Sequence, residues 1–155
     1  QYNCSSASGE FIDFGELSKT QTKAATHQLL VATNAPYGLS ITTSGTTMTA
    51  GNNVIPALAS PTGSITGQSQ FGMNFRDNGS PDVGLEPVGP GTGVAVSPNY
   101  NIPNQFTFNN GDVVASSSGT TDLYRLTGSM VVNVNGSQPP GVYSTTILYI
   151  CLANF

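Results

Sequence analysis

Few side chains in this chain could carry out acid–base or metal chemistry, and only one of them is a histidine. His27 lies in the aliphatic run 27–31, which is typical of a strand. A catalytic triad or a multi-histidine metal site needs partners that a single histidine does not supply. A lone histidine in a strand is most often a packing or surface residue. We therefore expect no catalytic residue and no enzymatic activity.

The carboxylates offer little more. Eight of them could include a glycosidase pair, but such a pair is defined by a separation in space that the sequence does not show. The segment 77–82 is rich in oxygen-bearing side chains, and its Asp77 and Asp82 could bind calcium. It lacks the glutamate spacing of an EF-hand, and segments of this kind usually form turns. We expect no cofactor, and calcium at Asp77 and Asp82 remains an alternative.

The two cysteines, Cys4 and Cys151, lie close to opposite ends of the chain. In an exported protein an even number of cysteines usually forms disulfides, so the sequence predicts a Cys4–Cys151 bond. Closing so long a loop is worth about 4 to 5 kcal/mol in the chain-entropy model. Two free thiols, or a bridge between neighbouring subunits, are the alternatives.

The composition excludes several classes of function. Charged residues make up 8% of the 155 residues, with four basic and eight acidic side chains and a net charge of −4. Four cations do not form a basic patch, so nucleic acid is not an expected partner. The chain has no apolar run near the roughly 18 residues of a membrane-spanning helix. So low a charge makes close packing of identical subunits electrostatically tolerable.

The start of the sequence bears on its expected location. The chain begins at Gln1 rather than Met, and its surface is expected to be rich in hydroxyl and amide groups. Together these features predict an exported protein whose signal peptide has been removed. The expected location is extracellular or at the cell surface.

Clusters of Gly, Pro, Asn, Asp and Ser recur at short intervals between β-branched and aromatic runs. Each cluster supplies residues that tolerate a positive φ or fix a bend. The spacing predicts one all-β domain over 1–155, an immunoglobulin-like antiparallel sandwich of about 7–9 strands. The expected strands are 10–15, 27–33, 37–43, 46–49, 64–74, 105–109, 112–116, 122–135 and 142–152.

Two of these strands have the clearest patterns. In 122–135, apolar residues alternate with residues that include Arg125 and Thr127, which is typical of a strand with one face in solvent. In 142–152 both faces become apolar toward the C-terminal end. This favours a central strand, or one that a partner covers, and predicts that the strand ends in a buried position.

The stretch 77–103 contains five prolines and several glycines, and it has no sustained alternation. Proline removes a donor from a β-ladder, so this stretch is expected to leave the central sheet. It is either a rigid connection between sheets or a binding loop.

Several short motifs occur in an order that resembles bacterial pilus subunits of the spore coat U or Csu-type (archaic chaperone–usher) family. They are Cys4, FIDFG at 11–15, PYGLSI at 36–41 and GVYSTT at 141–146, which leads into the last strand. The resemblance covers about the first 45 and the last 15 residues. In that family the early cysteine usually pairs at the end of the next strand, where this chain has Val31, Ala32 and Thr33. The family also carries a strand-donating extension before that cysteine, where this chain has three residues.

The resemblance implies a structural subunit of an extracellular filament or coat, which assembles by addition of a β-strand from one copy to the next. Its partners would be copies of itself, and a periplasmic chaperone and an usher during export. The expected assembly interface comprises Phe11, Ile12, Phe14, Ile147, Tyr149 and Ile150. The alternative is a monomeric secreted carbohydrate-binding or adhesin domain that uses 77–103.

Overall fold

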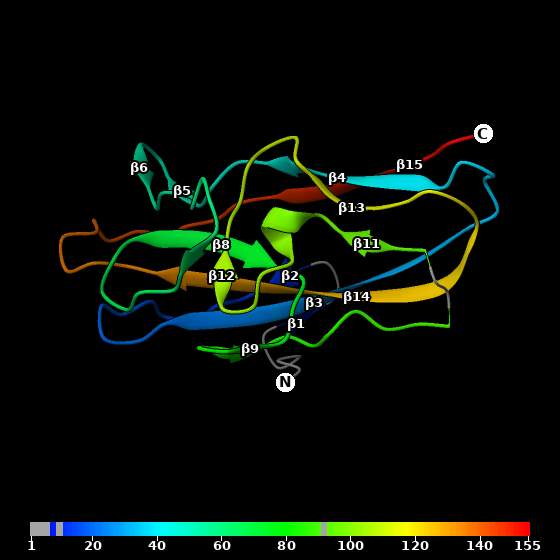
Figure 1. Cartoon of the computed structure of the whole chain (residues 1–155). Coiled ribbons are helices and arrows are strands. Elements are labelled where there is room, and N and C mark those ends of the chain that lie inside the picture. The colour runs from blue at the N-terminus through cyan, green and yellow to red at the C-terminus, as the bar shows by residue number, and fades with distance from the viewer. Residues whose placement is uncertain (1–6, 9–10, 91–92) are drawn as a thin grey trace.

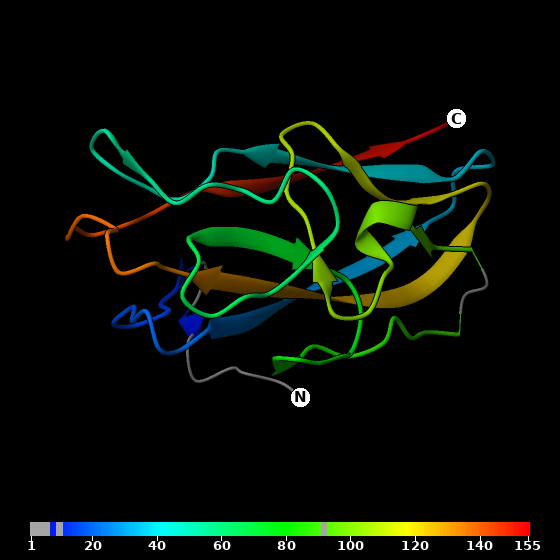
Figure 2. The ribbon, with the colours of Figure 1, turned by 60° about the vertical axis from the view of Figure 1, so that its left-hand side comes forward.

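The computed structural model describes residues 7–8, 11–90 and 93–155, which form an antiparallel β-sandwich (Figures 1 and 2). The predicted all-β sandwich is therefore confirmed. Within these ranges there is no α-helix, and the one 3-10 turn is η2 (Pro98–Tyr100). None of the described residues belongs to a helix that is long and apolar enough to cross a membrane.

The sandwich consists of two main sheets with four and three strands. The four-stranded sheet has the order β11 (Ala95–Val96), β13 (Val113–Ser117), β4 (Leu39–Gly45), β15 (Ile147–Ala153). The three-stranded sheet has the order β3 (Lys23–Thr33), β14 (Thr121–Asn133), β8 (Gln70–Asn74). β15 is an edge of the first sheet and β3 is an edge of the second.

Four short hairpins or ladders decorate the sandwich. They pair β1 (Ala7–Ser8) with β2 (Phe11–Ile12), β5 (Thr49–Ala50) with β6 (Asn53–Val54), β7 (Thr62–Gly63) with β12 (Gln105–Phe106), and β9 (Asn78–Gly79) with β10 (Asp82–Val83). The β5–β6 and β9–β10 hairpins lie at clusters of turn-forming residues, because Gly, Asn and Pro allow tight reversals. β7 and β12 are instead far apart in the chain and pair across it.

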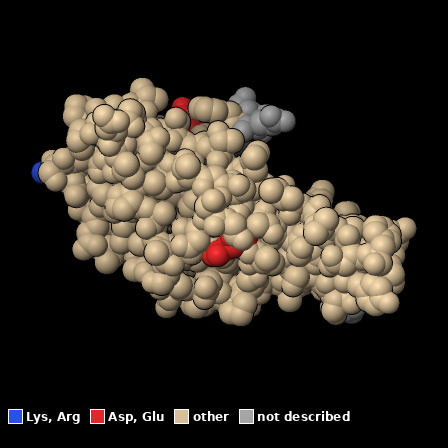
Figure 3. All heavy atoms as spheres, turned by 90° about the horizontal axis from the view of Figure 1, so that it is seen from above, with Lys and Arg blue, Asp and Glu red and all other residues tan. Residues whose placement is uncertain are grey.

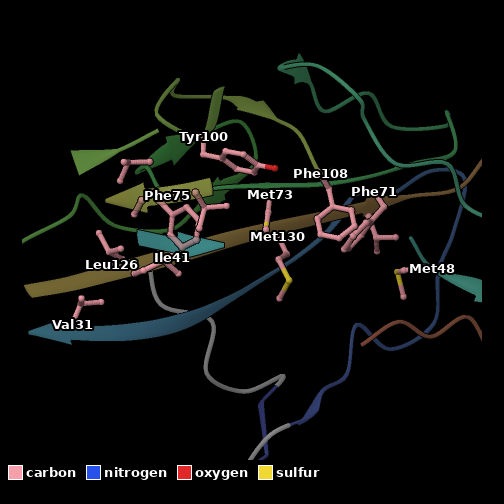
Figure 4. Close-up of a cluster of buried hydrophobic side chains, with 14 of the residues drawn as sticks. Val31, Ile41, Met48, Phe71, Met73, Phe75, Tyr100, Phe108, Leu126 and Met130 are labelled. Carbon is pink, nitrogen blue, oxygen red and sulfur yellow. The ribbon is translucent and has the colours of Figure 1, made fainter. Parts of the chain in front are cut away.

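The main core fills the space between the inner faces of the two sheets (Figure 4). Phe71, Met73 and Leu126 from the three-stranded sheet are fully buried, and Leu39 and Ile41 of β4 are 2% exposed. Burial of side chains of this size stabilises the fold by about 1.5–3 kcal/mol each. The period-2 alternation of these residues is what turns one face of each strand toward the core.

The three-stranded sheet is covered on its outer face as well. Val83 and Phe106, from the segments that carry β10 and β12, pack on the outer side of Val131 in β14. Gly72 of β8 allows this close approach, because a Cβ there would lie 3.0 Å from the Cβ of Phe106. β8 and most of β14 are consequently buried on both faces.

This cover overturns the prediction that the strand at 122–135 has one face in solvent. Thr127, Ser129 and Asn133 of β14 are all buried. Ser129 Oγ donates to the carbonyl oxygen of Arg76 at 3.1 Å, and Asn133 Nδ2 donates to Gln70 Oε1 at 3.3 Å. Ser129 and Asn133 therefore belong to buried hydrogen bonds rather than to a wet face, whereas Thr127 Oγ1 is buried with no hydrogen-bond partner within the described residues.

The prediction for the last strand is wrong in its start, its central position and its buried end, whereas the alternative that a partner covers it stays a prediction. β15 begins at Ile147, and Val142, in the loop before it, is 90% exposed. β15 is an edge strand rather than a central one, and Leu152 near its end is 63% exposed rather than buried. Apolar residues do lie on both faces of β15, as predicted, but the chain covers only the inner face.

The proline-rich stretch 77–103 connects the two sheets. It leaves the end of β8, forms the β9–β10 hairpin and contacts β14 through a bridge between Val88 and Arg125. It then adds β11 to the other sheet, and Tyr100 in η2 is buried in the core. Tyr100 is the only aromatic residue of the stretch, so no exposed ring is available there to stack on a sugar.

The calcium alternative at Asp77 and Asp82 receives no support from the geometry. Asp77 and Asp82 are exposed, and nowhere in the described residues do three acidic, histidine or cysteine side chains gather as metal ligands would. The Asn78 amide points inward instead. It pairs with the Asn74 amide at 2.7 and 3.0 Å and donates to the carbonyl oxygens of Arg76 and Val83.

Asn78 gives a test of this covered layer. We expect Asn78→Ala to lower the free energy of unfolding by about 3 kcal/mol, because it removes buried hydrogen bonds and leaves their partners unsatisfied. Asn52→Ala, at an exposed turn position, should change it by less than about 0.5 kcal/mol. Urea unfolding followed by fluorescence measures both. Equal effects in the two variants would show that the network does not stabilise the fold.

Candidate functional site

A groove of about 1140 Å³ opens along the side of the sandwich where β3 and β15 lie. Its floor is apolar and includes Phe71, Met130 and Met48 of the main core. Its walls are β3 at residues 26–28, Ile147 and Tyr149 of β15, and the loop before β15. The N-terminal segment 11–17 forms the remaining wall.

The groove exists because no further strand follows β15 in its sheet. Among the described residues β15 pairs only with β4, with Ile147 opposite Gly45 and Ala153 opposite Leu39. An edge strand that has an apolar inner face and no neighbour leaves part of the core open to the side.

The direction of the backbone groups of β15 follows from its pairing. Asn154 N–H donates to the carbonyl oxygen of Gly38 at 2.8 Å, and its own carbonyl accepts from Tyr37 at 3.2 Å. Because such groups alternate along an antiparallel pair, Leu148, Ile150 and Leu152 face β4. The groups that face away belong to Ile147, Tyr149, Cys151 and Ala153, for which no backbone partner is found in the described part of the chain.

Side chains of the N-terminal segment lie in the groove. Ile12, Phe14 and Leu17 are half-buried and pack against the main core, whereas Phe11 is 66% exposed. Asp13 Oδ1 accepts the N–H of Gly15 at 2.7 Å, and Gly15 has a φ of 68°, so the chain turns after Phe14. β2 pairs with β1 and with neither main sheet.

A contact between His27 and Tyr149 joins the two sheets at the groove. The Tyr149 hydroxyl lies 2.7 Å from His27 Nε2, and the two rings stack with centroids 5.2 Å apart. The hydroxyl also donates to Met73 Sδ at 3.3 Å, so Nε2–H of His27 is the donor in a consistent assignment. Gly128 on β14 makes room for the ring, because a Cβ there would lie 2.1 Å from His27 Cε1.

Burial keeps this pair uncharged. It lowers the pKa of His27 from 6.5 to about 4 and raises the pKa of Tyr149 above its usual range. Nδ1 of His27 is buried and has no hydrogen-bond partner within the described ranges. A proton on Nδ1 would place an unpaired charge inside the protein, so the imidazole is suited to packing and unsuited to proton transfer near neutral pH.

The groove brings together five of the six residues expected at the assembly interface. Phe11, Ile12, Phe14, Ile147 and Tyr149 all line it. Ile150 lies on the same strand but points to the opposite side of the sheet, where it is 54% exposed. Successive side chains of a strand point to opposite faces of the sheet, so residues taken from both faces of β15 do not all line one groove.

The cysteine pair stays a prediction. Cys151 on β15 is exposed and carries a free thiol, while Cys4 lies outside the described residues. The structure shows no disulfide between Cys151 and any described residue, and the Cys4–Cys151 bond, two free thiols and a bridge between subunits all stay predictions.

Several groove residues are not evident from the sequence. Met130 and Phe71 are typical core residues, and nothing in their pattern shows that they lie beneath an opening. The tyrosine of the GVYSTT motif, Tyr143, also lines the groove. Its hydroxyl donates to the carbonyl oxygen of Pro139 at 2.7 Å and accepts from Gln138 Nε2 at 2.8 Å, which fixes the loop before β15.

Comparison with known proteins does not add an identity to this geometry. No protein-family model, curated protein or solved structure matches the chain. The pilus-subunit resemblance and everything that it implies about function therefore remain proposals, to be argued from the groove.

The His27–Tyr149 contact predicts a dependence of stability on pH. The unfolded chain takes up a proton on His27 near pH 6.5, and the folded protein does so only near pH 4. Between these values the unfolded state binds more protons, so the free energy of unfolding is highest above about pH 6.5. It should fall by about 3 kcal/mol as the pH drops to about 4.

His27→Phe is the matched control, because it keeps a ring in the space and removes the titrating group. Urea unfolding at a series of pH values should show a shallower loss of stability in this variant, since the carboxylates titrate in both proteins. Equal slopes between about pH 6.5 and 5 would contradict the burial of a neutral imidazole.

Proposed function

We propose that this chain is a structural subunit of an extracellular filament or coat, and that it assembles when a strand from another copy adds along β15. The observation that carries the proposal is the coincidence of an unpaired strand edge with an apolar groove. Addition of a strand to an edge supplies backbone hydrogen bonds, and pockets for alternate side chains supply specificity. β15 and the groove offer both at one place.

The backbone of β15 supplies one half of such a contact. The outward backbone groups of Ile147, Tyr149, Cys151 and Ala153 can hydrogen-bond to an incoming strand. β15 contains no proline and no charged residue, which are the features that usually protect an edge from pairing with another chain. Such an edge favours association.

The groove supplies the other half. A strand placed beside β15 would direct every second side chain toward the apolar floor, where Met130 and Phe71 lie. The charged lining residues are Asp13 and Glu16 on the N-terminal segment and Lys19 just after it, and none is on the floor. Apolar side chains could therefore fill the groove without desolvating a charge.

The N-terminal segment is the donor that we propose. Ile12 and Phe14 alternate with exposed residues and already pack toward the core of their own chain. The segment is held there by side-chain contacts, and β2 has no ladder to β15 or β3. When this segment moves from its own groove into the groove of another copy, it makes the same side-chain contacts there. The exchange also adds hydrogen bonds to β15.

A monomeric carbohydrate-binding domain is less well supported. The stretch 77–103, where such a site was expected, is a connection whose only aromatic ring, Tyr100, is buried. It exposes no aromatic side chain that could stack on a sugar ring.

The proposal predicts the effect of charges placed in the groove. Phe14→Asp should abolish filaments in electron micrographs, because a carboxylate would be buried on the apolar floor. Ile147→Asp should also abolish filaments, because it places a carboxylate on the groove side of β15. Pro90→Asp, at an exposed position of the connection, should leave filaments unchanged.

Circular dichroism and urea unfolding of each variant separate loss of assembly from loss of folding. Phe14 lies outside both main sheets, so its variant is expected to stay folded. Filaments of normal length from a folded protein with charges at both positions would exclude strand addition at this groove.

A further inference from the structure

The chain contains three Asn–Gly pairs, at 78–79, 110–111 and 135–136. Such a pair can modify itself, because glycine has no Cβ to keep its backbone nitrogen away from the side-chain amide of the preceding asparagine. The reaction needs a glycine N–H that is not held in a hydrogen bond and an asparagine side chain that can reach it. The three pairs differ in both respects.

The first pair is buried and fully hydrogen-bonded. Asn78 is 2% exposed, and its amide group donates three hydrogen bonds. The N–H of Gly79 donates to Asn104 Oδ1 at 2.9 Å. Both the attacking nitrogen and the leaving amine are therefore held, and these hydrogen bonds have to break before Asn78 can react.

The second pair is exposed, but its attacking nitrogen is held as well. The N–H of Gly111 donates to the carbonyl oxygen of Thr43 at 2.8 Å. Asn110 Oδ1 accepts the N–H of Gly45 at 3.0 Å, which fixes the side chain against β4. Attack on the Asn110 side chain would break the bond between Gly111 and Thr43, so the fold protects this pair too.

The third pair lies in a turn at the rim of the groove. Asn135 and Gly136 both line the groove, and the Gln138 N–H donates to the carbonyl oxygen of Asn135 at 3.3 Å. Gly136 is exposed, and its N–H has no hydrogen-bond partner within the described ranges. Nδ2 of Asn135 likewise donates to no described residue. Neither the attacking nitrogen nor the leaving amine is held by the part of the chain that the structure describes.

Two neighbouring groups favour the reaction at this pair. Ser137 donates to Asn135 Oδ1 from its N–H and from its Oγ, each at 3.0 Å. These bonds stabilise the negative charge that the oxygen gains when the amide carbon is attacked. Lys19 Nζ lies 3.9 Å from the place that a Cβ of Gly136 would take. Its positive charge favours the deprotonated nitrogen and the carboxylate of the product.

We propose that Asn135 is a self-modification site, at which the Gly136 nitrogen attacks the Asn135 side chain and converts it to aspartate or isoaspartate. The nitrogen of Gly136 loses its proton to solvent and forms a bond to Asn135 Cγ. The bond between Cγ and Nδ2 breaks, and ammonia leaves with a proton taken from solvent. Water then opens the resulting succinimide ring at either of its carbonyl carbons. The net reaction consumes water, releases ammonia and involves no oxidation or reduction.

The product differs from the original chain in charge and in backbone length. It gains a negative charge, in a chain whose net charge is −4. Charged side chains are sparse on the face in Figure 3, and one new carboxylate is enough to separate the product by ion exchange. Isoaspartate also adds a methylene group to the backbone of the turn that leads to the loop before β15. The reaction takes place within one chain, so it does not depend on the proposed function.

Incubation of the purified, folded protein at mildly alkaline pH over several weeks tests the site. Tryptic digestion and fragmentation in a mass spectrometer locate the conversion, and chromatography separates aspartate from isoaspartate peptides. Asn135 should convert at least about tenfold faster than Asn110 or Asn78, because hydrogen bonds have to break at the other two pairs. Isoaspartate should accompany aspartate, since water opens the ring at both carbonyl carbons.

Two controls show whether the fold and the Gly136 nitrogen are responsible. In guanidinium chloride the three pairs should convert at similar rates, because their protection comes from the fold. Gly136→Ala is the matched variant, since a Cβ there shields the nitrogen and lies 3.4 Å from Lys19 Cδ, which is an ordinary contact. This variant should stay folded and convert at Asn135 at least about tenfold more slowly.

Two results would overturn the inference. One is conversion of Asn110 or Asn78 in the folded protein at a rate equal to or above that of Asn135. The other is an equal rate at Asn135 in the wild type and in Gly136→Ala, which would mean that the side chain is hydrolysed without the Gly136 nitrogen. Filaments are observed separately in electron micrographs, so their absence would contradict the proposed function and leave the result at Asn135 unchanged.

Discussion

The need of backbone N–H and C=O groups for hydrogen-bond partners is the constraint on which this structure depends most. Along β15 one set of these groups is paired with β4, and the outward set has no strand beside it in the described residues. The missing neighbour also leaves the core open between β15 and β3, so the unpaired edge and the apolar groove have one cause. The His27–Tyr149 contact joins the two sheets at this opening.

The two sheets differ in how their outer faces are covered. The three-stranded sheet is covered on both faces by its own chain, with a buried network around Asn74 and Asn78 that satisfies the polar groups of the cover. The four-stranded sheet is covered only on its inner face. The four strands of this sheet contain no charged residue, so like subunits can approach them without repulsion between charges on these strands.

Alternation and turn residues were enough to predict the sandwich and to place most strands near their observed positions. They could not distinguish which strand is central, because polar residues such as Ser129 and Asn133 look the same in solvent and in a satisfied buried network. The groove was predictable in part. The sequence shows apolar residues on both faces of β15 and an alternation of apolar residues at 11–14. The pairing of His27 with Gly128 and Tyr149 was not, since it depends on contacts across more than one hundred residues.

Amide hydrogen exchange along β15 tests the central claim most directly. In the monomer the amides of Leu148, Ile150 and Leu152, which face β4, should exchange slowly, and those of Tyr149 and Cys151 should exchange rapidly. In the assembled form all five should be protected, because an added strand pairs with the outward set. Rapid exchange of Tyr149 and Cys151 in the assembly would show that subunits do not join at this edge.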